Sequence, residues 1–459
     1  MNESSDAELG EIIPYGSIYI DCNASDIVLA TRRCFTRYND SDRREIITEL
    51  SSLFQSPHHT NVLPCFSVRT GLDLFLECKK FPPDSEIILS AINIPDIVRI
   101  IRHHGLKPVP VDINIDTIGV DPRDLESVIT NRTVAVIVAH IFGKWMDVAH
   151  LIAVAQHHRL VFIEDCAEAF SGFERMGHPE SDLIFFSFGT IKVCTAFGGA
   201  IVKIKDDFLY EQMEKVYATY PMYGTREYLA KLQKCLFIHN MLNVPCIMKC
   251  SIELARLFNV DHQKMAVNMM RGFTSGDLTT SLRKQANTSL LATMLARLKQ
   301  FDQQKHEKSQ EKANYVVMRL PPEMKVVGAA ARNKDFWLFP VLTESPKFAI
   351  TMLKKLGVDA YIGSTQLDVI YPDDCQIPEV AIDEIEGESS HSSSSVVSDD
   401  SDSSTSSHFP LQGKYLMDHV IYLPVHKNVP YKLLDKICLA LYMVVTKQKI
   451  KASASRAKL

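Results

Sequence analysis

The stretch LVFIED, residues Leu160–Asp165, decides how this chain folds, together with LIFFSF, residues Leu183–Phe188. Both runs are apolar at almost every position, as is typical of parallel strands that are buried on both faces. Asp165 ends the first run, and Lys192 follows the second run shortly before a pair of glycines. Because ligands bind at the carboxyl ends of strands in open α/β sheets, this pattern predicts a binding site that holds a carboxylate and an amine.

A carboxylate and a lysine at such a position suit the cofactor pyridoxal phosphate. The lysine amine can form a Schiff base with the aldehyde, and the carboxylate can keep the ring nitrogen protonated so that the ring acts as an electron sink. Each residue also has an ordinary explanation, since Asp165 could cap a following helix and Lys192 could be a surface lysine. The spacing of the pair and the nearby glycines favour the cofactor.

Similar apolar runs alternate with helix-like segments throughout residues 60–205. Further strands are expected at Glu86–Ala91, Lys107–Ile113, Val134–His140 and Gly199–Ile204. The segments between them have the periodicity of amphipathic helices. The alternation predicts an α/β domain with a mainly parallel sheet.

The rest of the chain divides by composition. Residues 206–285 are rich in Leu, Met, Lys and Tyr and are expected to form a helical insertion, whereas a second, smaller α/β unit begins with helices over residues 286–320 and continues at FWLFPVLT. The expected organisation is an N-terminal segment 1–59, a cofactor-binding domain 60–205, a helical insertion 206–285, a small domain 286–450 and a tail 451–459.

Two segments near the C-terminus have unusual composition. Residues 389–407 are serine-rich and acidic, which predicts a disordered loop, either a site of regulatory phosphorylation or a tolerated insertion. The final Ala457-Lys458-Leu459 resembles a variant of the C-terminal peroxisomal address, although a frayed basic tail is an equal alternative. The expected location is therefore cytoplasmic or peroxisomal.

The bulk composition excludes several classes of protein. The 459 residues carry a net charge of −5, and the chain has no nucleic-acid-binding signature, so no nucleic-acid partner is expected. The 11 cysteines are scattered and the first residues lack a signal-peptide layout, which indicates a reducing compartment. No spaced cluster of Cys and His predicts a metal site.

The most apolar segment of the insertion is Cys235–Phe258. Polar residues and a proline interrupt it, and no clean run of about 18 apolar residues occurs, so no transmembrane helix is expected. A buried pair of helices is the preferred interpretation, with a contact at a membrane surface as the alternative.

Two blocks of sequence, VFIEDCAEAFSG and FSFGTIKVCTAFGGAIV, resemble the DegT family of pyridoxal phosphate-dependent sugar aminotransferases, which have fold type I. The resemblance is nearly continuous from about residue 68 to 205 and resumes more weakly from about 283 to 445. It implies that Lys192 is the Schiff-base lysine, that Asp165 pairs with the pyridinium nitrogen, and that Ser187 binds the cofactor phosphate.

The resemblance also implies roles for residues outside these blocks. The phosphate-binding turn of the family aligns with Arg69, Thr70 and Gly71, whose backbone N–H groups would hold the phosphate with help from the Thr70 hydroxyl and the Arg69 charge. Glu168 stands where the family has Gln or His beside the cofactor. Ile94 replaces the aromatic residue that stacks on the ring.

The implied reaction moves an amino group from an amino acid, with glutamate the expected donor, to a keto group of a nucleotide-linked sugar. The resemblance also implies a homodimer in which each subunit completes the other's site, but the Asn-Tyr-Arg segment that does so is not recognisable near Arg283. Two other functions remain as alternatives. One is a weakly active protein that binds pyridoxal phosphate and serves as an interaction scaffold. The other is an enzyme that uses the cofactor for a different reaction; the resemblance implies that the dehydratase branch of the family lacks the lysine, so retention of Lys192 argues against that branch. His140 matches a family histidine, although a satisfied core histidine is the preferred interpretation.

Overall fold

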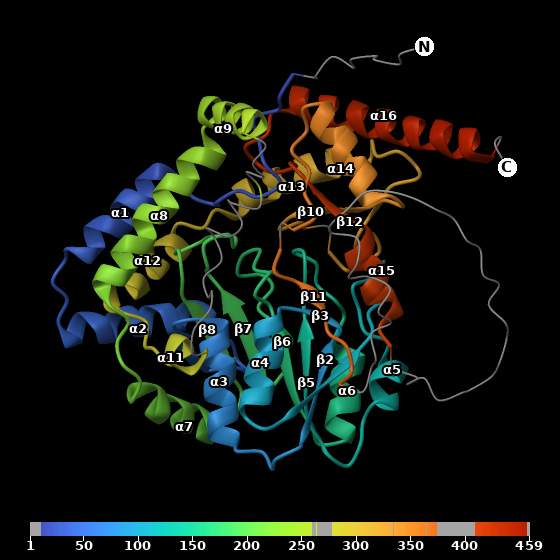
Figure 1. The fold of residues 1–459 in the computed structure, drawn as a ribbon. Helices are drawn as coiled ribbons and strands as arrows, with labels where there is room; N and C mark the ends of the chain where they lie inside the picture. Colours follow the sequence, from blue (N-terminus) through green and yellow to red (C-terminus); the bar gives the residue numbers. More distant parts are fainter. Residues whose placement is uncertain are drawn as a thin grey trace.

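A central sheet with helices on both faces forms the lower half of the molecule in Figure 1. The computed structural model describes residues 11–258, 263, 278–333, 335–363, 365–373 and 409–456. The serine-rich loop 389–407 and the terminal Ala457-Lys458-Leu459 lie outside the described residues, so what the sequence predicts for them stays a prediction.

The sheet has seven strands in the order β1-β8-β7-β6-β5-β2-β4. Their bounds are β1 Asn61–Cys65, β2 Glu86–Ser90, β4 Lys107–Val111, β5 Thr133–Ala139, β6 Val161–Asp165, β7 Leu183–Ser187 and β8 Ala200–Ile204. Only β8 runs against its neighbours, since its pairings with β1 and β7 are antiparallel and the remaining pairings are parallel. Every strand expected from the apolar runs forms, and the mainly parallel sheet is confirmed.

Helices bury both faces of this sheet, which explains why the strands are apolar at successive positions. One face is covered by α3 (Val68–Lys79), α4 (Pro95–His103) and α7 (Asp207–Ala218). The other face is covered by α2 (Asp40–Phe54), α5 (Pro122–Ser127) and α6 (Ala149–His157). Ile87 and Leu89 belong to the first core and Ile88 to the second, as the alternation of side chains along a strand requires.

The described part of residues 206–285 is helical, as expected, and contains α7, α8 (Thr225–Asn243), α9 (Pro245–Leu257) and α11 (Leu278–Leu282). α8 packs against α1 (Ala24–Cys34), which also contacts α12 (Thr288–Lys299). These helices stand beside the sheet and rise past its upper edge (Figure 1).

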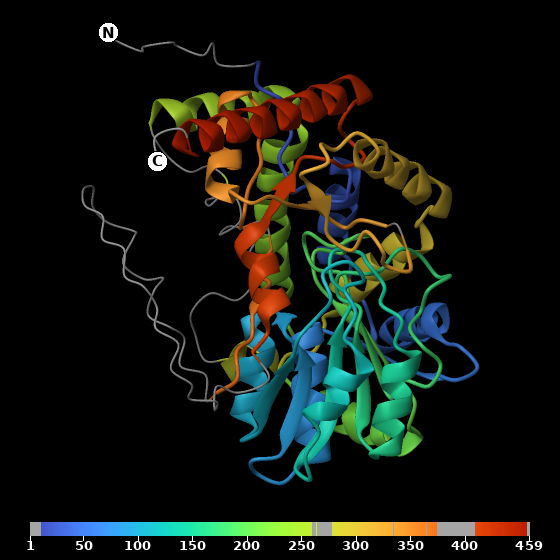
Figure 2. The same cartoon turned by 90° about the vertical axis from the view of Figure 1, so that its right-hand side faces the viewer.

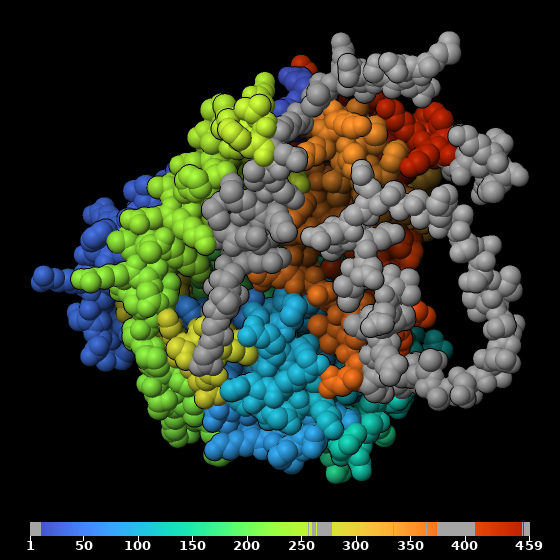
Figure 3. Space-filling model, viewed as in Figure 1, coloured from blue at the N-terminus to red at the C-terminus, as the bar shows by residue number. Residues whose placement is uncertain are grey.

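The expected buried helical pair is only half correct. α8 buries a face through Leu232, Cys235 and Ile238, but α9 packs through its inner face and leaves Ile247 and Leu254 exposed. The yellow-green atoms of this region form part of the surface in Figure 3. Among the described helices, none is by itself long and apolar enough to cross a membrane, whereas α8 and Pro245–Ala255 meet that test together as a pair bent by 87°.

The C-terminal unit lies above the sheet (Figure 2) and has its own core. A three-stranded sheet in the order β12-β10-β9 is surrounded by helices. The elements are α13 Gln303–Val317, β9 Lys325–Val326, β10 Phe339–Leu342, α14 Pro346–Lys355, α15 Leu411–His419, β12 Val420–Leu423 and α16 Tyr431–Arg456. The last helix continues through most of the expected tail 451–459.

A short strand ties this unit to the edge of the main sheet. β11 (Asp368–Val369) pairs antiparallel with β3 (Ile92–Asn93), and the N–H of Ile370 donates to the carbonyl of Ala91 at 2.7 Å. Because β3 follows β2, the pairing brings residues 365–367 to the carboxyl ends of the parallel strands. The segment therefore covers the edge where the sequence predicts a binding site.

Candidate active site

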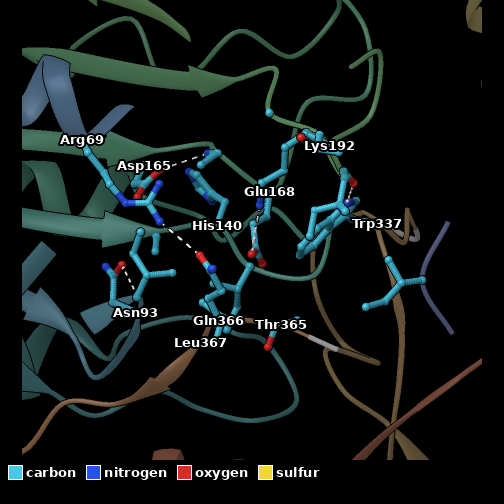
Figure 4. Close-up of a pocket in the computed structure, with 18 of the residues that line it drawn as sticks. Arg69, Asn93, His140, Asp165, Glu168, Lys192, Trp337, Thr365, Gln366 and Leu367 are labelled. Carbon is cyan, nitrogen blue, oxygen red and sulfur yellow. Dashed lines mark hydrogen bonds and ion pairs between the residues drawn. The ribbon is translucent and has the colours of Figure 1, made fainter. Parts of the chain in front are cut away.

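A cavity of about 170 Å³ opens at the carboxyl ends of the parallel strands (Figure 4). Four parts of the chain line it: the strand ends of the main sheet with the loops and helix starts that follow them, helix α8, segments of the C-terminal unit, and Ile18 of the N-terminal segment. The lining residues used below are Arg69, Asn93, Ile94, His140, Asp165, Glu168, Lys192, Lys231, Trp337 and Gln366.

Lys192 lies in the loop between β7 and β8 and points into this cavity. Its Nζ is 3.2 Å from Oε1 of Glu168 and 3.8 Å from the centre of the Trp337 ring. Burial lowers the pKa of the Lys192 ammonium, and the negative charge of Glu168 opposes that shift. The amine is thus held at a fixed place in a partly desolvated site.

Asp165 ends β6 and faces the same cavity. Its Oδ1 accepts a hydrogen bond from the N–H of Ala167 at 3.0 Å, and the residue is 7% exposed. Burial raises the pKa of this carboxyl, while the Ala167 hydrogen bond and the positive charge of Lys192 oppose the rise. The two residues on which the sequence argument depends therefore lie within electrostatic reach of each other.

Trp337 fixes the loop that carries Lys192. Its indole Nε1–H donates to the carbonyl of Ile191 at 2.7 Å, and its backbone N–H donates to Phe142 at 3.0 Å. The backbone N–H of Phe142 in turn donates to Glu168 at 3.2 Å. Trp337 belongs to the stretch FWLFPVLT of the second α/β unit, and nothing local in the sequence relates it to Lys192.

His140 contributes a ring edge to the cavity wall, but its nitrogens serve the protein interior. Nδ1 accepts from the N–H of Met146 at 3.1 Å, so the proton is on Nε2, which donates to Glu164 at 2.9 Å. Glu164 also accepts from Ser181 and from the N–H of His178. These contacts agree with the preferred interpretation of a satisfied core histidine.

One group of possible metal-binding atoms occurs where the sequence predicts none. Atoms of His140, Glu164 and Cys166 lie within 4.8 Å of one another, and all three residues are buried. The hydrogen bonds of His140 and Glu164 already use their ligand atoms, and burial raises the pKa of the Cys166 thiol, which keeps it protonated. The spacing arises because β5 and β6 are neighbouring strands.

The expected phosphate turn, Arg69, Thr70 and Gly71, lies in the first turn of α3; that its backbone N–H groups hold the phosphate stays a prediction, and the side chains divide between cavity and core. α3 begins at Val68, and its N-cap is Ser67, whose Oγ accepts from the N–H of Thr70 at 3.1 Å. The Thr70 hydroxyl donates to the carbonyl of Leu282 at 2.8 Å, and a Cβ on Gly71 would lie 2.7 Å from Val202. Thr70 and Gly71 therefore face the protein core and are not among the residues that line the cavity.

Arg69 does reach the cavity, but its guanidinium is paired there. Nε is 2.7 Å from Asp96, and Nη2 donates to Oε1 of Gln366 at 3.1 Å, as the dashed line in Figure 4 marks. Burial lowers the pKa of Arg69, and the carboxylate of Asp96 opposes the shift. Arg69 thus joins the first turn of α3 to the segment that crosses from the C-terminal unit.

Ile94 lines the cavity as the N-cap residue of α4. The side chain before it, Asn93, is 2% exposed; its Oδ1 accepts from the N–H of Ile94 at 2.8 Å. In the described part of the chain, Asn93 Nδ2 has no acceptor. A buried amide donor without an acceptor is costly, which indicates that a bound molecule supplies one.

Ser187, the last residue of β7, lies just outside the main cavity. Its Oγ is 3.4 Å from the N–H of Gly189, and the residue lines a small adjoining hollow with Glu168, Lys192 and Trp337. The structure therefore brings Asp165, Glu168, Lys192, Arg69 and Ile94 to one cavity and Ser187 to its margin. The site residues expected from the sequence do not include four that line the cavity, namely Asn93, Lys231, Trp337 and Gln366. Of these, only Asn93 could have been found from the sequence, because it stands next to the expected residue Ile94.

This chain belongs to the DegT/DnrJ/EryC1/StrS aminotransferase family, whose sequence model matches residues 48–330. The match includes all the strands of the main sheet and α8, and it ends before Trp337 and Gln366. The resemblance to this family is confirmed.

Curated relatives match a shorter stretch. The spore coat polysaccharide biosynthesis protein SpsC of Bacillus subtilis is 31% identical over 167 residues, which are 36% of this chain and 42% of SpsC. GDP-perosamine synthase of Caulobacter vibrioides is 29% identical over 215 residues, which are 46% of this chain and 56% of the synthase. The chain thus spans about half the length of the curated relatives it matches.

Solved structures resemble the whole molecule. DesI, determined in the presence of its TDP-sugar product, superposes with a TM-score of 0.58 over 96% of this chain and 95% of DesI, at 16% identity. At this identity the likeness shows the fold, and it confirms the predicted fold type I architecture.

Proposed function

We propose that this protein is a pyridoxal phosphate-dependent aminotransferase that acts on the keto group of a nucleotide-linked sugar. The observation that carries the proposal is that Asp165 and Lys192, from the ends of neighbouring parallel strands, face one cavity. Membership of the DegT/DnrJ/EryC1/StrS aminotransferase family supports it. The expected amino donor is glutamate, and a homodimer is the expected assembly.

The lining residues fit the cofactor. Asp165 is placed to hold the ring nitrogen, Lys192 to hold the aldehyde carbon, and Ile94 to cover one face of the ring with an aliphatic surface. The unused donor of Asn93 leaves room for a hydrogen bond to a polar group of the cofactor or substrate. Bound pyridoxal phosphate would supply an electron sink for the carbon that loses a proton.

Lys192 is the residue that would move that proton. Its lowered pKa increases the fraction of neutral amine near pH 7, and a neutral amine can both attack an aldehyde and accept a proton. Glu168 and the Trp337 ring hold the ammonium form in place when the proton has been taken up. A positively charged ring N–H would favour the ionised carboxylate of Asp165, against the effect of burial.

Relatives that share the fold or part of the sequence support this acceptor class. One relative is named a GDP-perosamine synthase, and DesI was solved with its TDP-sugar product. We expect a keto-sugar that carries a nucleotide diphosphate, with the sugar directed toward Lys192.

The first experiment is a titration of the purified protein with pyridoxal phosphate, followed by absorption spectroscopy. A visible band from the lysine-linked cofactor should form in the wild type and in Lys234→Ala, whose lysine is exposed on α8, and should be lost in Lys192→Ala. A missing band, or a band that Lys192→Ala retains, would contradict the cofactor assignment.

The second experiment adds the two substrates in turn. Glutamate should convert the bound cofactor to its amine form, and a nucleotide-linked keto-sugar should restore the first spectrum, as a ping-pong transfer requires. A band that no amino acid changes would instead indicate a protein that binds the cofactor without transferring an amino group.

A further inference from the structure

Lys231 is a cation of the cavity that has no role in the proposed chemistry. Lys231, on α8, lines the cavity with Gly189, Thr190 and Arg69. Its Nζ lies 3.5 Å from the position that a Cβ on Gly198 would occupy, so the ammonium rests against the loop that follows Lys192. Within the residues that the structure describes, Lys231 has no hydrogen bond or ion pair.

Lys231 is half-buried, and its ammonium has no anionic partner among the described residues. Burial lowers the pKa of Lys231, and the positive charge of Arg69 lowers it further. A partly desolvated charge is costly unless an opposite charge or hydrogen-bond acceptors surround it. Arg69 has Asp96 as its anion, whereas Lys231 has none in the described chain. The site is therefore electrostatically incomplete and suits a bound anion.

Lys231 stands close to the start of α3. The N–H of Gly199 donates to the carbonyl of Phe66 at 3.1 Å, which fixes the glycine loop against the residue before the N-cap Ser67. Lys231 rests on Gly198 of that loop. The first N–H groups of a helix point out of it and favour anions. A phosphate between the α3 start and α8 would meet both the helix amides and the ammonium.

We propose that Lys231 binds the phosphate group of the cofactor from within the same chain. This inference rests on the proposed function, because it assumes that pyridoxal phosphate occupies the cavity. α8 would then be part of the cofactor site, which gives this helix of residues 206–285 a role.

The neighbourhood of Arg283 agrees with this assignment. The family resemblance implies a segment near this residue that reaches the site of a partner subunit, but no such segment is recognisable. Arg283 itself is 3.0 Å from Asp73 and 2.8 Å from Glu77, both on α3, and it is not a lining residue of the cavity. Lys231 would contribute to the site from within the same chain.

The test compares two ligands that differ only in the phosphate. Dissociation constants for pyridoxal phosphate and for pyridoxal are measured by absorption titration in the wild type, Lys231→Met and Lys234→Met. Lys234 is exposed on the same helix and serves as the matched control. The wild type should prefer the phosphorylated ligand, and Lys231→Met should reduce that preference about 10- to 100-fold, the range expected for one hydrogen bond to a charged group.

The pattern of affinities separates the outcomes. In Lys231→Met, pyridoxal should bind as in the wild type, and Lys234→Met should leave both constants unchanged; Lys231→Arg should restore part of the preference. An unchanged preference in Lys231→Met would overturn the inference, as would an equal loss for both ligands, which marks general damage to the cavity.

Two further results would also overturn it. If Lys231→Met retains the preference but weakens inhibition by a free nucleoside diphosphate, the lysine serves the substrate diphosphate instead. A wild type that binds both ligands equally would reject this inference while leaving the proposed function standing, whereas a wild type that binds neither would reject both.

Discussion

The two walls of the cavity have different origins. One wall consists of strand ends and the loops that directly follow them, and it carries Asp165, Glu168 and Lys192. The other wall consists of segments far away in the sequence, with Lys231 from α8, Trp337 before β10 and Gln366 before β11. The strand-end wall holds the groups suited to the cofactor's reactive atoms, and the covering wall holds groups that position, screen or complete them.

The two walls differ in what determines the position of their side chains. Parallel strands must end at the same edge, so side chains at their ends are brought together by the sheet itself. The covering wall depends on how α8 and the C-terminal unit dock, which is a matter of tertiary packing. We therefore expect changes in the strand-end wall to abolish chemistry, and changes in the covering wall to alter binding.

The largest effect is expected for Asp165→Asn. The amide would leave the protonated ring nitrogen without its anion, and breaking a buried charge pair costs about 3–5 kcal/mol, which corresponds to a loss on the order of 10²- to 10⁴-fold. The measurement is kcat/KM for the transfer, beside the affinity for pyridoxal phosphate. Asp124→Asn, on the exposed side of α5, is the control, and an Asp165→Asn enzyme with near wild-type kcat/KM would refute the pairing.

A change in pH dependence is expected for Glu168→Gln. Burial already lowers the pKa of Lys192 and Glu168 raises it, so loss of the carboxylate should lower that pKa further. Lys192 reacts as the neutral amine, so the rate of band formation rises with pH through its pKa, and the midpoint should move to lower pH by about 1–2 units.

Trp337→Leu should move this midpoint in the same direction by less than a unit, because the cation–π contact with Lys192 is lost together with the indole hydrogen bond to Ile191 that fixes the loop. A midpoint that rises in Glu168→Gln would show that the ion pair with Lys192 does not govern the titration.

An effect on binding alone is expected for Gln366→Leu. The substitution removes the acceptor for Arg69 Nη2 in the covering wall, and the KM for the keto-sugar should rise about tenfold, as for one hydrogen bond to a charged group. The affinity for pyridoxal phosphate should stay within about twofold of the wild type. Gln304→Leu, exposed on α13, is the control. A parallel loss of cofactor affinity would remove the distinction between the two walls.

The smallest effect on the site is expected for Thr70→Val. The hydroxyl bonds the carbonyl of Leu282 in the protein core, so its loss should lower the free energy of unfolding by about 1–2 kcal/mol. The preference for pyridoxal phosphate over pyridoxal should not change, which denaturant unfolding and the ligand titrations can establish together. A specific loss of phosphate preference would restore the role that the sequence alignment assigns to Thr70.

The position of Thr70 shows why part of the site could not be predicted. The resemblance places the phosphate turn at Arg69, Thr70 and Gly71, and these residues lie in the first turn of α3, which Ser67 caps and which begins at Val68. Adjacent side chains on a helix point about 100° apart, so Arg69 reaches the cavity while Thr70 and Gly71 face the core. Gly71 is in this position because Val202 leaves no room for a side chain.

α9 and Lys231 show the same limitation in the helical region. Apolar composition predicts a buried pair, yet Ile247 and Leu254 lie on the surface, since burial depends on what packs against each face. Lys231 has no local pattern that separates it from Lys234. Only the position of α8 beside the glycine loop brings it into the cavity.

The sequence by itself determined the parallel sheet, the family, and the meeting of Asp165 with Lys192. These follow from local patterns, because apolar runs specify strands buried on both faces and strands of one direction end at one edge. The tertiary structure alone decided which groups face that pair across the cavity. Lys231, Trp337 and Gln366 come from elements whose docking depends on long-range packing, and no spacing within the sequence encodes those contacts.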